Sequence, residues 1–400
     1  MVEQSKIFKP DIGAIFRQYG PVYRESHRLS PEQRKAMYAI EACRTAVLGG
    51  HVEKCDNCGY ERPFYNSCRN RHCPQCQSLA REHWIEARKQ DLLSTVYYHV
   101  VFTIPSQLNP LALVNKEVLY NILFRAASET LLQLGRDPKH LGAEIGITAI
   151  LHTWGQNLMD HPHLHCIVTG GGLSKDGQRW VKPKKTNEER NFFIHINIIS
   201  YLFKYKFLAY LMEAYKAEGL KFIGKNEALG VEDNFCSFVN DLYKKRWITF
   251  CKESFGGPED VISYLGQYTH RVAISNNRII NVEHDAISFH FKDYADQNQQ
   301  KIMTLNVFEF MRRFLLHILP HGFYKIRYYG ILSNRNHSSK LKRCQDILNV
   351  SDRCEVISSL TWEELLFELT GMDLRVCPVC KKGHMRYKEK INTQAPVVPP

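Results

Sequence analysis

The alternation of apolar and polar positions along the chain predicts an α+β protein. Helices are expected where apolar residues recur at helical spacing, at 31–47, 78–95, 112–135, 196–217, 258–270 and 304–318. Strands are expected where β-branched and aromatic residues concentrate, at 97–105, 145–154, 163–168, 271–282, 286–292 and 324–332. Ser30 and Gln33 form a predicted capping box around the first-turn Pro31. This order predicts an antiparallel sheet with helices packed on it, preceded by a helical, cysteine-rich module.

The charge of the chain indicates a polyanionic partner. Its 400 residues include ordinary shares of hydrophobic (44%) and charged (24%) side chains, but the net charge is +12. Residues 301–343 hold nine Lys or Arg residues and one acid, Glu309. Such an excess is either a solvated face or a footprint for nucleic acid. The first six residues lack an apolar signal core, and no run approaches the roughly 18 apolar residues of a membrane span, so we expect a cytoplasmic protein.

The cysteines predict a structural zinc site. Thirteen cysteines in a chain without a secretory signal favour reduced thiols and metal over disulfides. Cys55 and Cys58 form one Cys-x-x-Cys pair, and Cys73 and Cys76 form another after fourteen residues. Four thiolates suit tetrahedral zinc in a closed site. Three further donors could replace a ligand, hold a second ion or simply pack: His51, Cys68 and His72.

A second zinc site is expected near the C-terminus. Cys377 and Cys380 supply half of such a site. The remaining ligands could be His384 with Cys344 or Cys354. The alternative is that Cys377 and Cys380 are free or buried thiols.

The most informative residues are a histidine pair and a tyrosine pair. His163 and His165 lie two apart on a predicted strand, so both imidazoles point to one face and can bind one divalent ion. Tyr264 and Tyr268 lie one turn apart on a predicted helix. Each pair alone is more often structural than functional. Together with the cysteine module and the basic charge, they favour metal-assisted DNA strand transfer through a phosphotyrosine.

Two histidines need a further ligand to hold Mg²⁺ or Mn²⁺. We expect Gln156, seven residues before His163, to supply it across a hairpin. Its rivals are Gln267, His270 and His161.

Several basic residues are expected to contact DNA. Residues 323–329 interleave aromatic rings with cations, a composition that stacks bases while following a phosphate backbone, although an edge strand has the same pattern. The expected contacts are Arg69, Arg71, Arg271, Arg312, Arg313, Lys325 and Arg327. Arg271 and Lys252 are also candidates for the scissile phosphate. We expect the binding to be salt-sensitive.

The combined motifs resemble the two-tyrosine rolling-circle transposases of the insertion sequence ninety-one family. These are HUH endonucleases, named for two histidines that flank a bulky hydrophobic residue. The matching segments are 65–76, 152–156, 163–165, 264–275 and 329–330, and the resemblance extends from about residue 15 to residue 385. It implies an HUH-type sheet and a protein associated with the nucleoid. It also implies five regions: helical (1–50), zinc-binding with a connecting helix (51–95), catalytic (96–335), basic C-terminal (336–390) and a disordered tail (391–400).

The implied reaction is transesterification on single-stranded DNA at the ends of a mobile element and at its target. Tyr264 and Tyr268 would each form a 5′-phosphotyrosine link, which retains the bond energy, so the reaction needs no nucleotide cofactor. The sequence accordingly has no P-loop motif. The alternatives are a plasmid relaxase or replication initiator with the same chemistry, and a non-catalytic zinc-dependent DNA-binding regulator. A zinc hydrolase is disfavoured because no H-E-x-x-H motif is present.

Overall fold

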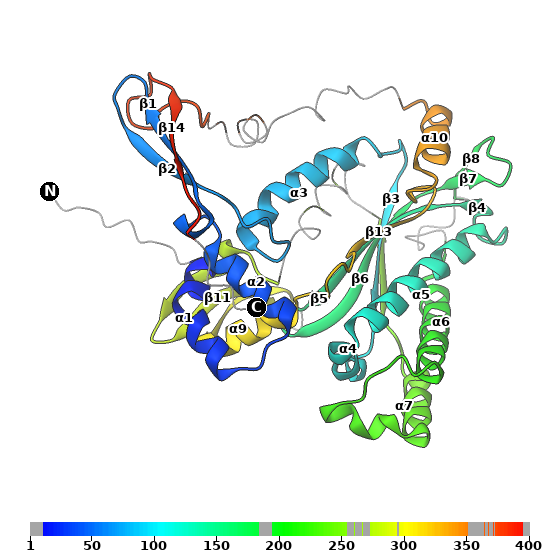
Figure 1. The fold of residues 1–400 in the computed structure, drawn as a ribbon. Coiled ribbons are helices and arrows are strands. Elements are labelled where there is room, and N and C mark those ends of the chain that lie inside the picture. Colours follow the sequence, from blue (N-terminus) through cyan, green and yellow to red (C-terminus); the bar gives the residue numbers. More distant parts are fainter. Residues whose placement is uncertain are drawn as a thin grey trace.

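A five-stranded antiparallel sheet organises the larger part of the chain (Figure 1). The computed structural model describes residues 11–183, 194–253, 260, 266, 273–293, 296–350, 364, 367, 371 and 373–394. The strand order is β13 (Ile326–Gly330), β5 (Gly146–Trp154), β6 (Asp160–Thr169), β3 (Tyr97–Thr103) and β9 (Thr249–Glu253). The central strands β5 and β6 are buried along most of their length, as expected for apolar runs inside a sheet.

The two faces of this sheet have different coverings. Leu164, Cys166 and Val168 of β6 point into the largest hydrophobic core, which is shared with helices of the other layer. Those helices are α4 (Asn109–Val114), α5 (Lys116–Arg136), α6 (Ile196–Lys216) and α7 (Glu232–Lys244). Ile167, on the opposite face, packs with Ile85 of α3 (Pro74–Lys89). Helix α3 therefore lies over one face and α5 and α6 over the other (Figure 1).

One end of the large sheet adjoins a smaller one. It consists of β4 (Ala143–Glu144), β7 (Gly172–Ser174) and β8 (Trp180–Val181), with α10 (Lys342–Ile347) packed nearby. The main chain enters this region at Gly330, whose φ of 64° is a left-handed conformation. A β-carbon there would overlap the carbonyl oxygen of Ile145, so the turn after β13 requires glycine.

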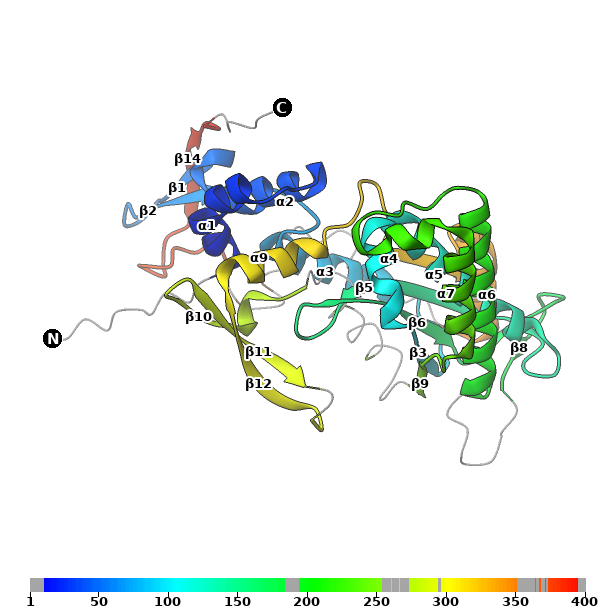
Figure 2. The same ribbon diagram turned by 90° about the horizontal axis from the view of Figure 1, so that it is seen from below.

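A second hydrophobic core joins the N-terminal helices to a distant segment (Figure 2). It combines α1 (Ile12–Ser26) and α2 (Pro31–Ala42) with α9 (Val307–Leu316) and the sheet of β10 (Ile279–Glu283), β11 (Ala286–Asp293) and β12 (Gln299–Asn306). Phe16 of α1 packs edge-on against Phe314 of α9, with ring centroids 5.3 Å apart.

The fourth sheet joins the N-terminal part of the chain to the C-terminal segment. Strand β14 (Met385–Ile391) pairs with β1 (Gly50–Cys55), which also pairs with β2 (Glu61–Tyr65). Contacts cross the boundaries of the predicted regions. The second core joins region 1–50 to part of region 96–335, and β14 of region 336–390 pairs with β1, which lies almost entirely in region 51–95.

The predicted fold class is confirmed, and most predicted elements lie close to their expected positions. The capping box at Ser30 and Gln33 is present. The helix expected from residue 304 starts at Val307, because Asn306 caps it by accepting a hydrogen bond from the N–H of Phe308. Residues 299–306 instead form β12, which the sequence analysis missed. Of the strand expected at 271–282, residues 271 and 272 lie outside the described residues. Within 273–282, strand β10 begins at Ile279, after a short 3₁₀ turn at Asn276–Arg278.

Candidate catalytic metal centre and two cysteine clusters

Three histidines converge on the face of the large sheet that α3 partly covers. In the antiparallel register, His163 of β6 lies opposite His152 of β5, and His165 lies opposite Ile150. Directly paired residues share a face, as do residues two apart on one strand. One ring nitrogen from each of His152, His163 and His165 lies within 4.8 Å of the others. This donor set fits a single divalent ion.

Neighbouring groups orient the two histidines of the predicted pair. The Nδ1–H of His163 donates to the carbonyl oxygen of His161 at 2.6 Å, which leaves Nε2 of His163 for an ion. Nδ1 of His165 lies 2.8 Å from Nε2 of His99 on β3, and the two rings are stacked. This contact assigns Nε2 of His165 to the ion as well. His99 is thus a candidate positioning residue, which the sequence prediction did not include.

Burial favours the neutral form of His99, His163 and His165. It lowers the pKa of His163 and that of His99 to about 4, and lowers the pKa of His165 well below its usual value. Neutral imidazole is the form that binds metal, so the site is ready for a cation at physiological pH.

His152 is a candidate ligand that the sequence prediction did not include, because its position beside His163 depends on strand register. Gln156, the ligand predicted from the sequence, lies in the turn between β5 and β6, and its backbone carbonyl accepts a hydrogen bond from Arg278 at 2.6 Å. His152 instead faces His163 across the hairpin, and its ring stacks on Trp154 with centroids 4.7 Å apart. A hairpin register drawn from the sequence would have placed His152 beside His163.

The predicted tyrosine helix is only partly described. Tyr264, Tyr268, Gln267, His270 and Arg271 lie outside the described residues, whereas Asp260 and Gly266 are helical, as predicted.

Gly266, midway between the two tyrosines, is buried against α3. A β-carbon there would overlap the side chain of Ile85, which itself packs with Ile150 and Ile167 beside His165. Gly266 is therefore linked to the histidine face through one layer of side chains.

We expect the substitution Gly266→Leu to reduce tyrosine–DNA adduct formation strongly, by about 100-fold, because the added side chain must displace the packed Ile85 and shift the segment. The measurement is the adduct rate on labelled single-stranded DNA. Gly177→Leu is the matched control for a general effect of adding leucine, since nothing lies within 4 Å of a β-carbon built there, although its φ of 69° adds backbone strain. A normal adduct rate in Gly266→Leu would show that this contact does not position the tyrosines.

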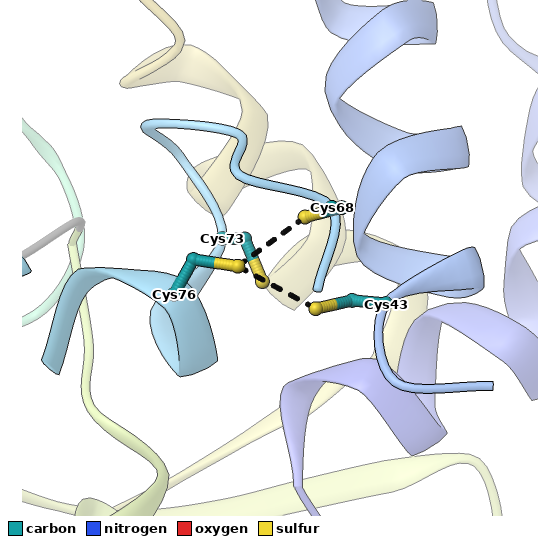
Figure 3. Close-up of side chains that lie close together, drawn as sticks. All are labelled: Cys43, Cys68, Cys73 and Cys76. Carbon is teal, nitrogen blue, oxygen red and sulfur yellow. Dashed lines mark hydrogen bonds between the residues drawn. The ribbon is translucent and has the colours of Figure 1, made fainter. Parts of the chain in front are cut away.

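Four cysteines meet between the N-terminal helices and α3 (Figure 3). Cys43 follows α2, Cys68 lies in the loop after β2, and Cys73 and Cys76 are at the start of α3. The sulfur of Cys76 is 3.6 Å from that of Cys43 and 3.6 Å from that of Cys68. Zinc–sulfur bonds of about 2.3 Å in a tetrahedron separate the sulfurs by about 3.8 Å, so the cluster fits one zinc ion.

Four other cysteines form a separate cluster at the sheet of β14, β1 and β2. Cys55 ends β1 and Cys58 lies in the turn between β1 and β2, and Cys377 and Cys380 approach them from the C-terminal segment. The sulfur–sulfur distances are 3.7 Å for Cys55 and Cys380 and 3.7 Å for Cys58 and Cys377. Backbone N–H groups lower the pKa of the Cys380 thiol to about 5, which favours the thiolate that zinc requires.

The structure thus corrects the expected ligand grouping. Cys55 and Cys58 do not share a cluster with Cys73 and Cys76; each pair joins a different partner pair, because α2 carries Cys43 to one and β14 brings Cys377 and Cys380 to the other. Of the alternatives, Cys68 is a member of the first cluster. His51, His72, Cys344 and His384 belong to neither cluster, and Cys354 lies outside the described residues.

Most of the arginines predicted to contact DNA also make contacts within the protein. Arg71 donates to the carbonyl oxygens of Phe323 and Pro320. Arg312 and Arg313 both pair with Glu309.

Two further basic residues of the predicted set lie near the edge strand β13. Arg327 donates to Asn121 and stacks over Phe124 of α5. Burial near Arg71 lowers the pKa of Lys325 to about 7.

The remaining basic candidates are more open. Arg69 is exposed beside Cys68, and the exposed Lys252 of β9 lies opposite His99 in the strand register, on the histidine face.

Comparisons with known proteins agree with this geometry. Residues 146–340 match a family model described as putative transposase, and residues 15–104 match a transposase zinc-binding domain of the IS91 type. These matches define the chain as a transposase with a zinc-binding module. It is 50% identical over 379 residues, 94% of both chains, to the putative transposase y4qJ of Sinorhizobium fredii (strain NBRC 101917 / NGR234). It is 28% identical over 316 residues to the transposase for insertion sequence element IS801 of Pseudomonas savastanoi pv. phaseolicola, covering 78% of this chain and 72% of that protein.

The chain therefore belongs to the IS91 and IS801 family of transposases, as its motifs indicated. The zinc-binding domain and the two clusters support structural zinc. No solved structure matches the chain. Within the described residues, no helix has the length and apolar character to cross a membrane.

Proposed function

We propose that this transposase cleaves and rejoins single-stranded DNA by metal-assisted transesterification through 5′-phosphotyrosine intermediates, and that this reaction drives rolling-circle transposition. The convergence of His152, His163 and His165 on one sheet face is the observation that supports the proposal most. The burial of Gly266 over the same face adds to it, because the tyrosines flank that residue.

The proposed reaction conserves the number of phosphoester bonds. The phenolic oxygen of Tyr264 or Tyr268 bonds to the phosphorus, and the 3′ oxygen of the DNA leaves and takes up a proton. A free 3′-hydroxyl attacks the phosphotyrosine in the reverse sense and joins two strands, so no ATP is consumed. Mg²⁺ or Mn²⁺ on the three histidines would polarise the phosphate oxygens and stabilise the developing charge. Two tyrosines allow a second cleavage while the first strand is held.

The test uses labelled single-stranded oligonucleotides that tile the ends of the element, incubated with the protein and Mn²⁺ or Mg²⁺. We expect an SDS-resistant adduct on Tyr264 or Tyr268, mapped by peptide mass spectrometry. Each Tyr→Phe substitution is expected to remove its own adduct and the double substitution both, because phenylalanine has no attacking oxygen. EDTA and His163→Ala are expected to abolish cleavage. Zinc-loaded protein that binds these strands but forms no adduct would favour a non-catalytic regulator.

A relaxase or replication initiator would give the same adduct. Strand transfer separates these alternatives from a transposase: we expect the cleaved element ends to be joined to a second, target strand in the same reaction. Cleavage and religation of a single site without such transfer would favour the plasmid-type enzymes.

A further inference from the structure

The edge of the large sheet at β9 carries an exposed aromatic and basic surface that the catalytic proposal does not use. Tyr201 and Tyr205 of α6 are 60% and 42% exposed, and Phe250 of β9 is 51% exposed. We name these three rings, with Lys204 and Arg246, the β9-edge surface. Large aromatic side chains exposed together on a folded protein usually mark a binding site.

The rings of this surface are arranged as a stacking platform. The centroids of Tyr201 and Tyr205 are 4.4 Å apart, and those of Tyr205 and Tyr243 are 5.2 Å apart. The Lys204 ammonium lies 5.5 Å from the centre of the Tyr205 ring and donates to the carbonyl oxygen of Tyr243. Exposed rings in a row, with cations between them, bind successive bases and the backbone of a single strand.

The platform borders a pocket with complementary charge for a phosphate backbone. The pocket has a volume of 520 Å³ and lies between α6 and β9, which adjoin in Figure 2. None of the described residues that line it is acidic. Arg246 is exposed at its wall, and the segment 242–252 contains four basic residues and no acid.

The pocket wall is fixed to the fold rather than loosely attached. Ser200 donates to the carbonyl oxygen of Trp247 at 2.7 Å, and the buried Trp247 ring packs on Phe203 and Phe207 of the main core. A platform held in place in this way loses little entropy when a ligand binds.

Phe250 connects the β9-edge surface to the histidine face. It lies opposite Val101 in the strand register, and Val101 lies opposite His165, so the three side chains share one face. The ring of Phe250 is 6.4 Å from that of His99, the residue that contacts His165. Thr249, which precedes Phe250 on β9, lines the pocket beside α6, so strand β9 joins this pocket to the candidate metal centre.

We propose that the β9-edge surface binds single-stranded DNA that flanks the cleaved phosphate and leads it to the histidine face. The proposal rests on the single-strand chemistry proposed above and adds to it the path of the strand. Duplex DNA cannot stack its paired bases on these rings, so the surface selects single strands.

Fluorescence anisotropy of the full-length, zinc-loaded protein with a labelled single-stranded oligonucleotide tests this path. We expect the double substitution Tyr201→Ala, Tyr205→Ala and the single substitution Phe250→Ala each to weaken binding about tenfold or more, with little change for blunt duplex DNA. We expect Arg246→Ala to reduce the slope of binding against salt by about one phosphate contact. Tyr387→Ala is the matched control, since this tyrosine is 67% exposed on the distant β14.

Adduct formation supplies the second readout. We expect the Tyr201, Tyr205 double variant to need more DNA for half-maximal adduct formation but to reach the wild-type rate at saturation. Single-strand affinities within twofold of wild type, or an equal loss on duplex DNA, would overturn the proposed path. A change from oligomer to monomer in the double variant, seen by light scattering, would assign the surface to a second copy of the chain instead. If the variants show the binding losses but the wild-type protein forms no adduct, the proposed chemistry is overturned and the binding surface is not.

Discussion

Replacing His152 with phenylalanine is expected to lower DNA cleavage by about 100-fold or more. His152 is only 3% exposed and lies within 4.8 Å of the paired histidines, so it completes the set of three donors. Phenylalanine keeps the ring that stacks on Trp154 and removes both nitrogens, so the loss reports on the metal rather than on packing. The measurement is the rate of adduct formation against Mn²⁺ concentration, in which the variant should need far more metal.

Two further variants make this experiment decide between the candidate ligands. We expect His161→Ala to retain most of the activity, because His161 lies outside the three-histidine set. We expect the same of Gln156→Ala, because Gln156 lies in the turn between β5 and β6, beyond the end of β5 that carries His152. The hydrogen bond from His163 to His161 is accepted by the backbone carbonyl, which alanine preserves, and only the contact between the two rings, with centroids 5.1 Å apart, is lost. If Gln156→Ala loses the activity while His152→Phe keeps it, the ligand expected from the sequence is the correct one. The melting temperature of each variant shows whether the fold is retained.

Local sequence patterns predicted the parts of this site that depend on neighbours in the chain. The alternation in β6 placed His163 and His165 on one face, and the side-chain chemistry of Ser30 and Gln33 located the start of α2. These features depend on strand geometry and on hydrogen bonds within a few residues, so they can be derived without knowledge of the fold.

Contacts between distant segments could not be derived in the same way. Cys55 lies beside Cys380 because β14 pairs with β1. The two cysteines are 325 residues apart in the sequence, so their spacing does not predict that they share a metal site. His99 reaches His165 only because β3 is the neighbour of β6, which is a property of the sheet order. Pattern reasoning grouped the two Cys-x-x-Cys pairs that are close in sequence, whereas each pair lies close in space to other cysteines.

Two separate cysteine clusters predict a different zinc content from that of a single site. We expect two zinc ions per wild-type chain by elemental analysis, and one ion in Cys73→Ser and in Cys377→Ser. The stability effects should differ greatly. Cys43 and Cys73 are 2% and 1% exposed within the core that joins α1, α2 and α9, so losing this ion should unfold that unit. Structural zinc contributes on the order of 10 kcal/mol, comparable to the whole stability of a domain.

Loss of the second ion should have a more local effect. Cys58 is exposed, and this cluster holds β14 against the β1–β2 hairpin rather than supporting a large core. Cys377→Ser should therefore make the C-terminal segment sensitive to proteolysis while the main thermal transition persists. Cys236→Ser is the control, because this half-buried cysteine belongs to neither cluster and should leave two ions in place. A wild-type protein with one ion, which is lost in Cys73→Ser but kept in Cys377→Ser, would contradict the second site. It would also contradict the idea that zinc holds the C-terminal segment against the β1–β2 hairpin.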